Sequence, residues 1–279
     1  MKINAYAKIN LMLNIVGKRP DNYHEVDMIM QSIGLCDVLH MEKIFSGIEL
    51  SGTGTLPYDE TNLAYKAAKL FFDVTGIRSG VRIHIQKNIP TCAGMGGGSA
   101  DCAAVLTGLN SMHGKVLNPK VLSSVSASLG ADVPFCLKGG TARAQGIGEI
   151  ITPIKPLPSK TVVVVKPPVS VSTPKAYGGL DLENLDHPDT SRATEAIEKS
   201  DLKTLYTLMG NSFEKSIFRD FPEIGSVKTQ MLSLGADVSL MSGSGSAVFG
   251  IFEDEVLAKT AFDTFKKSYK ETYLTKTNE

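Results

Sequence analysis

The sequence predicts an α+β protein of two domains. Strand-like alternation and helix-like spacing of apolar residues occur in both halves of the chain, which is typical of a mixed fold. A proline-rich stretch at residues 154–159 separates the halves, and a β-branched run begins directly after it. We therefore expect an N-terminal domain over residues 1–158 and a C-terminal domain over residues 159–279.

In the N-terminal half, strict alternation over residues 5–15 predicts a strand that carries Lys8 and Asn10 on one face. Gly130 ends the last helical pattern, and we expect the chain to continue through Asp132 into an apolar strand, with a turn between strands at Gly139-Gly140. The other expected strands are 27–33, 38–44, 48–51 and 81–86, and the expected helices are 62–74, 99–112 and 119–129.

In the C-terminal half, apolar spacing predicts helices and strands that are interspersed along the chain. The expected strands are 160–166, 236–241 and 246–252, and the expected helices are 191–199, 201–218, 222–234 and 255–270. No fixed-period repeat or low-complexity tract interrupts this order.

Composition limits the kinds of partner that this chain can have. Its 279 residues hold 29 Lys+Arg and 29 Asp+Glu, and this balance argues against binding bulk nucleic acid or an anionic membrane. A local site for one small anion remains compatible with it. The N-terminus does not resemble a signal peptide, so we expect a cytoplasmic protein. The cysteines form no CxxC pair and are expected to be free thiols: Cys36, Cys92, Cys102 and Cys136.

The most informative segment joins a predicted strand to a predicted helix and holds four glycines within five residues. Uncovered backbone N–H groups beside a helix N-terminus favour binding of phosphate. The segment is neither a Walker A loop nor a GxGxxG motif. The alternative is a glycine-rich turn that permits close packing. The candidate phosphate-binding residues are Pro90, Thr91, Cys92, Ala93, Gly94, Met95, Gly96, Gly97, Gly98, Ser99 and Ala100.

Other candidate segments are weaker when each is taken alone. Lys8 fits a solvated strand edge, and Tyr23 beside His24 fits surface packing in a turn. Asp132 follows a helix end, where aspartate is common as a turn or capping residue, and residues 241–247 form a second glycine-containing loop. Because no HExxH pair, zinc-ligand spacing or GxSxG elbow is present, metal hydrolase and serine hydrolase functions have no support.

Taken together and in order, three segments resemble the motifs of the GHMP kinases, which phosphorylate small-molecule alcohols with ATP. These segments are residues 7–10 (AKIN), 94–100 (GMGGGSA) and 241–245 (MSGSG), and the similarity extends over residues 5–252. The resemblance implies the α+β two-domain GHMP kinase fold. Its N-terminal domain is like the second domain of ribosomal protein S5, and its C-terminal domain is ferredoxin-like.

Two further segments, residues 18–25 and 131–135, are similar to one branch of this family. This implies phosphorylation of the 2-hydroxyl of a methylerythritol that carries a cytidine diphosphate group, in the non-mevalonate isoprenoid pathway. Asn22 stands where that branch commonly has glycine, and asparagine tolerates a positive φ better than most residues. Met95 replaces a leucine, which is a volume-conserving exchange.

The resemblance also implies roles for individual residues. Lys8 and Asp132 become the catalytic pair: Asp132 would accept the proton of the hydroxyl, and Lys8 would keep Asp132 ionised and attract the γ-phosphate. Residues 90–100 would hold the ATP phosphates, with the Ser99 hydroxyl a candidate contact for phosphate or Mg²⁺, whose other ligands stay open. Substrate would be bound by Asn10, by Tyr23 and His24 at the cytosine, and by Tyr177, Gly243 and Ser244.

Three alternatives remain at this point. Another GHMP kinase, acting on mevalonate, homoserine or galactose, is the nearest, but the Tyr23-His24 turn favours a cytidyl substrate. A non-catalytic ligand sensor on the same fold is disfavoured because both Lys8 and Asp132 are present. A nucleic-acid-binding module is disfavoured by the zero net charge. We expect a small-molecule substrate, neither nucleic acid nor membrane as a partner, and a monomer or weak homodimer.

Overall fold

The computed structural model describes residues 1–278, which form two compact units. The first unit consists of Met1–Ala7, Leu35–Ile89 and Gly96–Lys138, and the second of Lys8–Gly34, Pro90–Met95 and the chain from Gly139 onward. Two long strands, β1 (Lys2–Lys18) and β2 (His24–Ile44), pass from one unit into the other. The units are therefore interleaved along the chain, and the domain boundary at residue 158 stays a prediction.

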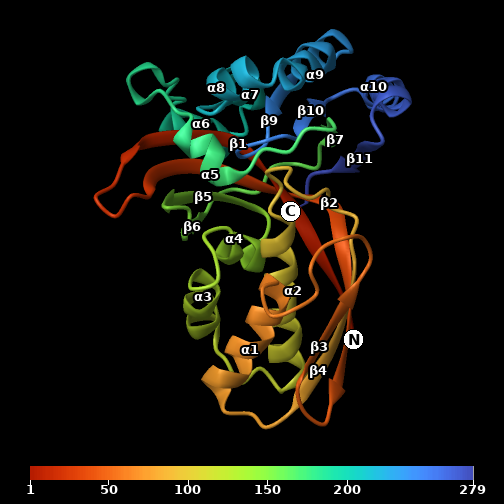
Figure 1. Cartoon of the computed structure of the whole chain (residues 1–279). Coiled ribbons are helices and arrows are strands. Elements are labelled where there is room, and N and C mark those ends of the chain that lie inside the picture. Colours follow the sequence, from red (N-terminus) through yellow and green to blue (C-terminus); the bar gives the residue numbers. More distant parts are fainter. Residues whose placement is uncertain (279) are drawn as a thin grey trace. The chain divides into compact units, whose positions relative to one another are not determined.

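A sheet and four helices build the first unit. β3 (Ile48–Gly52) pairs in parallel with β4 (Gly80–Gln86), which pairs antiparallel with the end of β2. Helices α1 (Leu63–Thr75) and α2 (Gly97–Met112) lie side by side (Figure 1). The Asn62 side chain caps the start of α1, and Gly76 ends it in a left-handed conformation, so the helix lies where it is expected, over residues 62–74, to within one residue.

One element of the first unit differs from the prediction. α3 (Pro119–Ala127) is followed by a short helix, α4 (Val133–Lys138), where we expected a strand after Asp132. Pro134 lies in the first turn of α4, where a missing backbone N–H is tolerated. Val133 and Phe135 are buried, and α4 packs against α2 and α3, so the apolar run is the buried face of a helix.

In the second unit, β1 and β2 each pair with later strands. β1 pairs in parallel with β8 (Gly210–Asn211), and β2 pairs antiparallel with β5 (Thr141–Gly146), which also pairs with β6 (Ile150–Pro153). The strands expected at 27–33 and 38–44 are parts of the single strand β2, so their separation was wrong. Gly34 interrupts the side-chain pattern between them but not the backbone.

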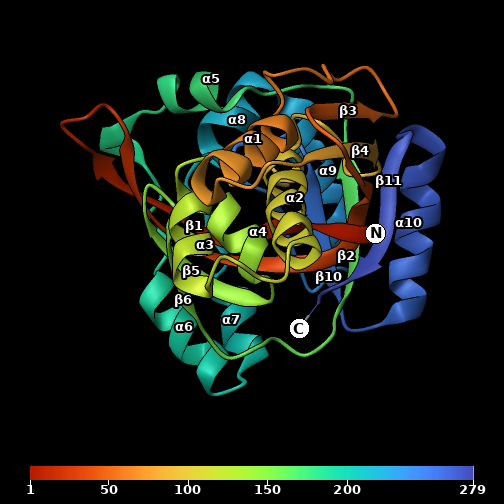
Figure 2. The same cartoon turned by 90° about the horizontal axis from the view of Figure 1, so that it is seen from below.

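A second sheet of this unit is entirely antiparallel, with the strand order β11-β7-β10-β9. Residues Val162–Val165 of its strand β7 (Thr161–Lys166) are buried. Helices α9 (Pro222–Ser233) and α10 (Glu255–Ser268) pack against the sheet, and α10 runs beside β11 (Figure 2). The remaining strands are β9 (Val238–Met241), β10 (Val248–Phe252) and β11 (Glu271–Lys276).

The helix expected over residues 201–218 is in fact two helices, separated by Gly210 and Asn211 of β8. These two residues are extended because they pair with Met12 and Leu13 of β1, which overrides the helical spacing around them. The other helices of the unit are α5 (Thr173–Gly178), the 3₁₀ helix η1 (Leu182–Asn184), α6 (Thr190–Glu198), α7 (Leu202–Leu208) and α8 (Glu214–Asp220).

The mixture of sheets and helices confirms the α+β class. Cys36, Cys92, Cys102 and Cys136 are free, as predicted. Over residues 1–278, no helix has both the length and the apolar character that crossing a membrane requires.

Candidate active site

The buried part of the glycine loop (residues 90–100) is fixed by close backbone contacts in the second unit. Gly94 has a φ of +71°, and a Cβ atom added to it would lie 1.9 Å from the carbonyl oxygen of Ser242. The Ser242 hydroxyl donates a hydrogen bond to the Gly94 carbonyl at 3.0 Å. Only glycine fits this position, because any side chain would collide with backbone. At Gly94, the glycine thus serves close packing, which is the alternative that the sequence left open for this loop.

The loop that packs on Gly94 is the second predicted glycine segment, residues 241–247. A Cβ atom on Gly243 would lie 2.9 Å from the Gly94 carbonyl oxygen, and the Ala247 N–H donates to the Ala93 carbonyl at 3.2 Å. From β8, the buried Asn211 amide donates to the Met241 and Gly243 carbonyls, both at 2.8 Å. The structure thus brings into contact two of the segments that carry the family resemblance, the glycine loop and residues 241–247.

Lys8 and Asn10 lie on β1 beside the same loop. The Lys8 backbone N–H donates to the Met95 carbonyl at 3.0 Å, and its ammonium donates to the Asn10 side-chain oxygen at 2.8 Å. Lys8 is 4% exposed and Asn10 is fully buried. The interpretation of Lys8 as a solvated edge residue is therefore wrong. A buried ammonium beside a candidate phosphate-binding loop is suited to attracting an anionic group.

The turn before β2 and helix α5 contribute aromatic rings. Asn22 adopts a φ of +68°, which confirms that asparagine serves here in place of glycine. The His24 and Tyr177 rings are stacked at 4.6 Å and 20°, and Phe213 packs edge-on against Tyr177. Tyr23 is 60% exposed. Burial, and then the charge of Lys18, lower the pKa of His24, so its ring is neutral near pH 7.

The exit from the glycine loop is the N-terminus of α2, in the first unit. Gly96, in a left-handed conformation, caps the helix without a side-chain hydrogen bond, and no acidic residue lies in the first turn. Gly98 is exposed and Ser99 is half-buried. The first backbone N–H groups of a helix have no partner within the helix and carry its positive dipole end. This end of α2 can therefore receive an anion such as a phosphate group.

Asp132 directly precedes α4, and its carbonyl accepts the Cys136 N–H at 3.1 Å. The residue is half-buried. Asp132 belongs to the first unit and Lys8 to the second. Their pairing as catalytic residues therefore stays a prediction.

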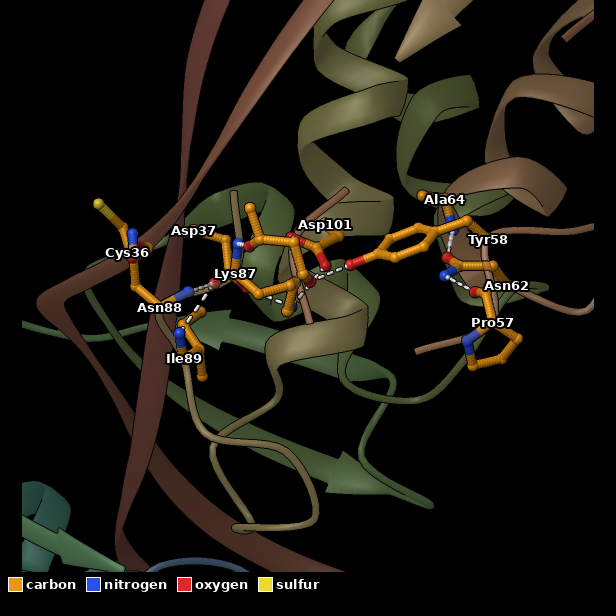
Figure 3. Close-up of polar contacts among 11 residues, drawn as sticks. Cys36, Asp37, Pro57, Tyr58, Asn62, Ala64, Lys87, Asn88, Ile89 and Asp101 are labelled. Atoms are coloured by element: carbon orange, nitrogen blue, oxygen red, sulfur yellow. Dashed lines mark hydrogen bonds and ion pairs between the residues drawn. The ribbon is translucent and has the colours of Figure 1, made fainter. Parts of the chain in front are cut away.

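Sequence reasoning missed a buried charged group in the first unit, which we call the Lys87 cluster: Asp37, Lys87 and Asp101 (Figure 3). The Lys87 ammonium binds the Asp37 carboxylate and, at 2.7 Å, an Asp101 carboxylate oxygen. The side chains of Asp37, Lys87 and Asp101 are 0%, 10% and 5% exposed. The Tyr58 ring points toward the cluster, and its hydroxyl donates to the Thr53 carbonyl.

One ammonium cannot neutralise two buried carboxylates, and this imbalance shifts the pKa values within the cluster. Burial raises the pKa of Asp101 to about 7; Lys87 opposes this effect and Asp37 adds to it. Burial lowers the pKa of Lys87, but the two carboxylates outweigh that effect and raise it overall. The second oxygen of Asp101 has no hydrogen-bond partner among the described residues. The sequence signal was weak, because each of the three residues alone fits an ordinary surface position.

The side chains of residues 1–278 include no group of three or more His, Cys, Asp or Glu that could hold a metal ion. Mg²⁺ in phosphoryl-transfer enzymes commonly binds through substrate phosphates and only one or two protein ligands. The Ser99 hydroxyl, half-buried in the first turn of α2, is compatible with such a contact.

Two family models match the chain: "GHMP kinases N terminal domain" over residues 62–140 and "GHMP kinases C terminal" over residues 193–271. A 4-diphosphocytidyl-2-C-methyl-D-erythritol kinase of Clostridium botulinum (strain Loch Maree / Type A3) is 43% identical over 279 residues, which cover 99% of this chain and 100% of the relative. This chain belongs to the GHMP kinase family. It is accordingly an ATP-dependent small-molecule kinase.

Further comparisons agree with membership of the GHMP kinases. A relative of the same name from Clostridium beijerinckii is 44% identical, with 99% of this chain and 100% of the relative covered. A crystal structure of 4-(cytidine 5'-diphospho)-2C-methyl-D-erythritol kinase has a TM-score of 0.86 at 35% identity and full coverage of both chains. L. major mevalonate kinase has a TM-score of 0.78 at 18% identity, covering 100% of this chain and 96% of that chain, which shows the shared fold alone.

Proposed function

We propose that this GHMP kinase transfers the γ-phosphate of ATP to the 2-hydroxyl of 4-diphosphocytidyl-2-C-methyl-D-erythritol, in the non-mevalonate isoprenoid pathway. The observation that carries the proposal is the 43% identity to a kinase of that name over the full length of both chains. Mevalonate and homoserine kinases match the structure at only 18% identity, so they give no support for another alcohol. A cytoplasmic location and a monomeric or weakly dimeric state stay predictions.

In this proposal, Asp132 accepts the proton of the substrate hydroxyl while Lys8 attracts the γ-phosphate. Phosphoryl transfer depends on orientation of the nucleophile and on neutralising the charge of the moving group. The buried ammonium of Lys8, oriented by Asn10, supports the second role. Asp132 is half-buried and not enclosed in the core, which is compatible with the first role.

The proposed ATP site is the glycine loop, with its phosphates at the N–H groups of Gly97, Gly98 and Ser99. Bound Mg²⁺ would shield the phosphate oxygens. The Ser99 hydroxyl is its proposed protein contact. The proposed alcohol site uses Asn10, with Gly243 and Ser244 of the 241–247 loop, which packs against Gly94.

Recognition of the cytosine is assigned to the aromatic residues of the second unit. The exposed Tyr23 offers a face for stacking, while the neutral ring or the backbone of His24 would hydrogen-bond the polar edge of the base. Tyr177 is proposed as a second ring, but its stacking on His24 gives it a supporting contact as well. Tyr23→Ala is expected to raise KM for the cytidyl substrate more than KM for ATP.

A coupled ADP-release assay tests the proposed activity. The purified chain is expected to release ADP with 4-diphosphocytidyl-2-C-methyl-D-erythritol far faster than with mevalonate or homoserine. Equal rates with another alcohol would contradict the proposed substrate. Absence of turnover with every alcohol, despite ATP binding, would favour the ligand-sensor alternative.

The Asp132→Asn variant tests the proposed base. Because a positioned base contributes about 10²–10⁴-fold, kcat is expected to fall by that factor while the thermal melt stays near that of the wild type. A folded variant with wild-type kcat would refute this role of Asp132.

A further inference from the structure

The chain leaves the first unit at Ile89, just before the glycine loop, and returns to this unit at Gly96. A single carboxylate fixes the segment that precedes the loop. After β4, the chain continues through Lys87, Asn88 and Ile89 before the loop starts at Pro90. One oxygen of Asp37 accepts hydrogen bonds from the Asn88 and Ile89 backbone N–H groups, the latter at 2.8 Å. Asp37, on β2, therefore holds the backbone at the entrance of the loop.

The exit of the loop is held through Asp101, one turn into α2. Asp101 accepts a 2.7 Å hydrogen bond from the Lys87 ammonium, whose other partner is Asp37. A Cβ atom added to Gly97 would lie 3.1 Å from the Ile89 side chain and 3.6 Å from the Lys87 nitrogen. Entrance and exit thus lie against each other, with one ammonium bonded to a carboxylate on either side (Figure 3).

Stability alone does not account for this arrangement. A buried ion cluster is weak evidence for stability, because apolar residues of similar size often serve as well or better. Here the cluster even leaves one buried Asp101 oxygen without a hydrogen-bond partner among the described residues. Such a group calls for another explanation, and its place at the two ends of the loop supplies one.

We propose that Lys87 is a positioning residue that ties the two ends of the glycine loop together through Asp37 and Asp101, and so sets the loop's affinity for nucleotide phosphates. The inference rests on the proposed function of this loop as the ATP site. In this proposal, the cluster affects nucleotide affinity through the ends of the loop. It has no role in binding the alcohol.

The test is whether a change in the cluster alters the affinity for nucleotide without altering the affinity for the alcohol. Phosphates held by loop backbone N–H groups lose affinity when the loop ends move apart, whereas Tyr23, His24 and Asn10 do not depend on Lys87. Asp101→Leu cuts the tie to α2 but leaves Lys87 and Asp37 as a neutral pair, so no unpaired buried charge results. Asp101→Ala makes the same cut without added bulk, and it replaces the leucine variant if that variant does not fold.

We expect the Asp101→Leu variant to raise KM for ATP, and Kd for ADP, roughly tenfold or more, because small displacements of binding groups have large effects. KM for the cytidyl alcohol should stay within about twofold of the wild type on the same reasoning. Asp101→Asn keeps an oxygen that accepts from Lys87, and it should restore the nucleotide affinity to within about twofold.

A matched control lies at the other end of α2. The buried Asn110 side chain bonds the Leu117 N–H and carbonyl, both at 2.9 Å. Asn110→Leu destabilises the same helix without touching the loop. It should lower the thermal melting temperature and leave KM for ATP unchanged.

Two results would overturn the inference. One is a wild-type Kd for ADP in Asp101→Leu or Asp101→Ala. The other is a loss of nucleotide affinity in Asp101→Asn or Asn110→Leu that is as large as the loss in Asp101→Leu. Because Kd for ADP is measured without alcohol, this test is separate from the proposed substrate. A wild-type chain that binds ADP but phosphorylates none of the alcohols would contradict the proposed function and leave the inference standing.

Discussion

Two regions hold the glycine loop, and they do so by different physical means. In the second unit, Gly94 and Ser242 are in contact through backbone atoms and one hydroxyl group, with no charge involved. In the first unit, the Lys87 cluster holds the loop ends with three ionisable side chains. Neutral close packing does not tolerate an added atom, whereas a charged cluster does not tolerate the loss of the partner that balances its charge. The neutral contact should therefore be disrupted by a substitution that adds atoms, and the charged cluster by one that removes a charged group.

Adding one carbon at the neutral contact should have the largest effect. In Gly94→Ala, the new Cβ would meet the Ser242 carbonyl at 1.9 Å, and alanine disfavours the φ of +71°. We expect a loss of about 3 kcal/mol or more in unfolding free energy. We also expect kcat/KM to fall by about 10²-fold or more. Urea unfolding and steady-state kinetics measure the two effects.

Gly114→Ala is the control that separates backbone strain at a positive φ from the steric clash of the added Cβ atom. Gly114 has a similar φ of +78°, but nothing lies within 4 Å of an added Cβ. It should lose only about 1–2 kcal/mol and keep kcat/KM. If both alanine variants behave alike, the Gly94 contact has no special role.

Removing one partner should be the most damaging change in the charged region. Lys87→Met leaves two buried carboxylates without their ammonium, which is expected to lower the unfolding free energy by about 3–5 kcal/mol. Asp101→Leu removes a charge as well but leaves a neutral pair, so its loss should be much smaller. Equal losses in the two variants, measured by urea unfolding, would show that charge balance is unimportant here.

The same region should respond to pH, unlike the neutral contact. The pKa of Asp101 is about 7 in the folded chain against an ordinary value of 3.8, so the folded chain binds this proton more tightly. Stability should therefore decrease as pH rises from about 4 to 7, by at most about 1.4 kcal/mol per unit, and level off above 7. Lys87, Asp37 and Tyr58 face this carboxyl group.

Asp101→Asn provides the reference for this pH dependence. Other groups titrate in both chains, so the difference in unfolding free energy between variant and wild type isolates Asp101. That difference should shift in favour of the variant between pH 5 and pH 8. A constant difference would mean that Asp101 does not take up the proton.

The smallest effect is expected at the hydroxyl of the neutral contact. Ser242→Ala removes one hydrogen bond of 3.0 Å to Gly94, which is worth about 1 kcal/mol. KM for ATP should rise about two- to fivefold, the equivalent of that energy. Ser126→Ala removes a similar bond, to the Ser123 carbonyl at 2.7 Å on α3, and should leave KM unchanged.

Local signals explain which parts of the molecule could be predicted from the sequence. Asn62 and Gly76 delimit α1, and the glycines within residues 94–98 indicate the loop. Residues Val133–Lys138 form a helix and not the expected strand, because a short apolar run in the sequence does not distinguish strand from helix. The signals that succeeded are all contained within a few neighbouring residues.

The parts that could not be predicted depend on distant pairs. Gly94 and Ser242 are 148 residues apart, and their contact is made largely by backbone, which leaves no side-chain pattern. Asp37 and Lys87 are 50 residues apart, and only folding makes them a buried pair. The predicted pairing of Lys8 with Asp132 is of the same kind and waits for the kinetic test.

The pairing of β1 with β8 has a consequence for synthesis of the chain. Ile15 and Ser212, which share a hydrogen bond beside this pairing, are 197 residues apart. At ribosomal rates this separation corresponds to roughly 10–40 s during which β1 lacks that neighbour. Stalled nascent chains that end before residue 210 should therefore be cleaved within β1 faster than chains that include β8, and equal protection in the two would refute this order. The strand that bears Lys8 and Asn10 is thus synthesised early but gains its pairing with β8 only late in synthesis.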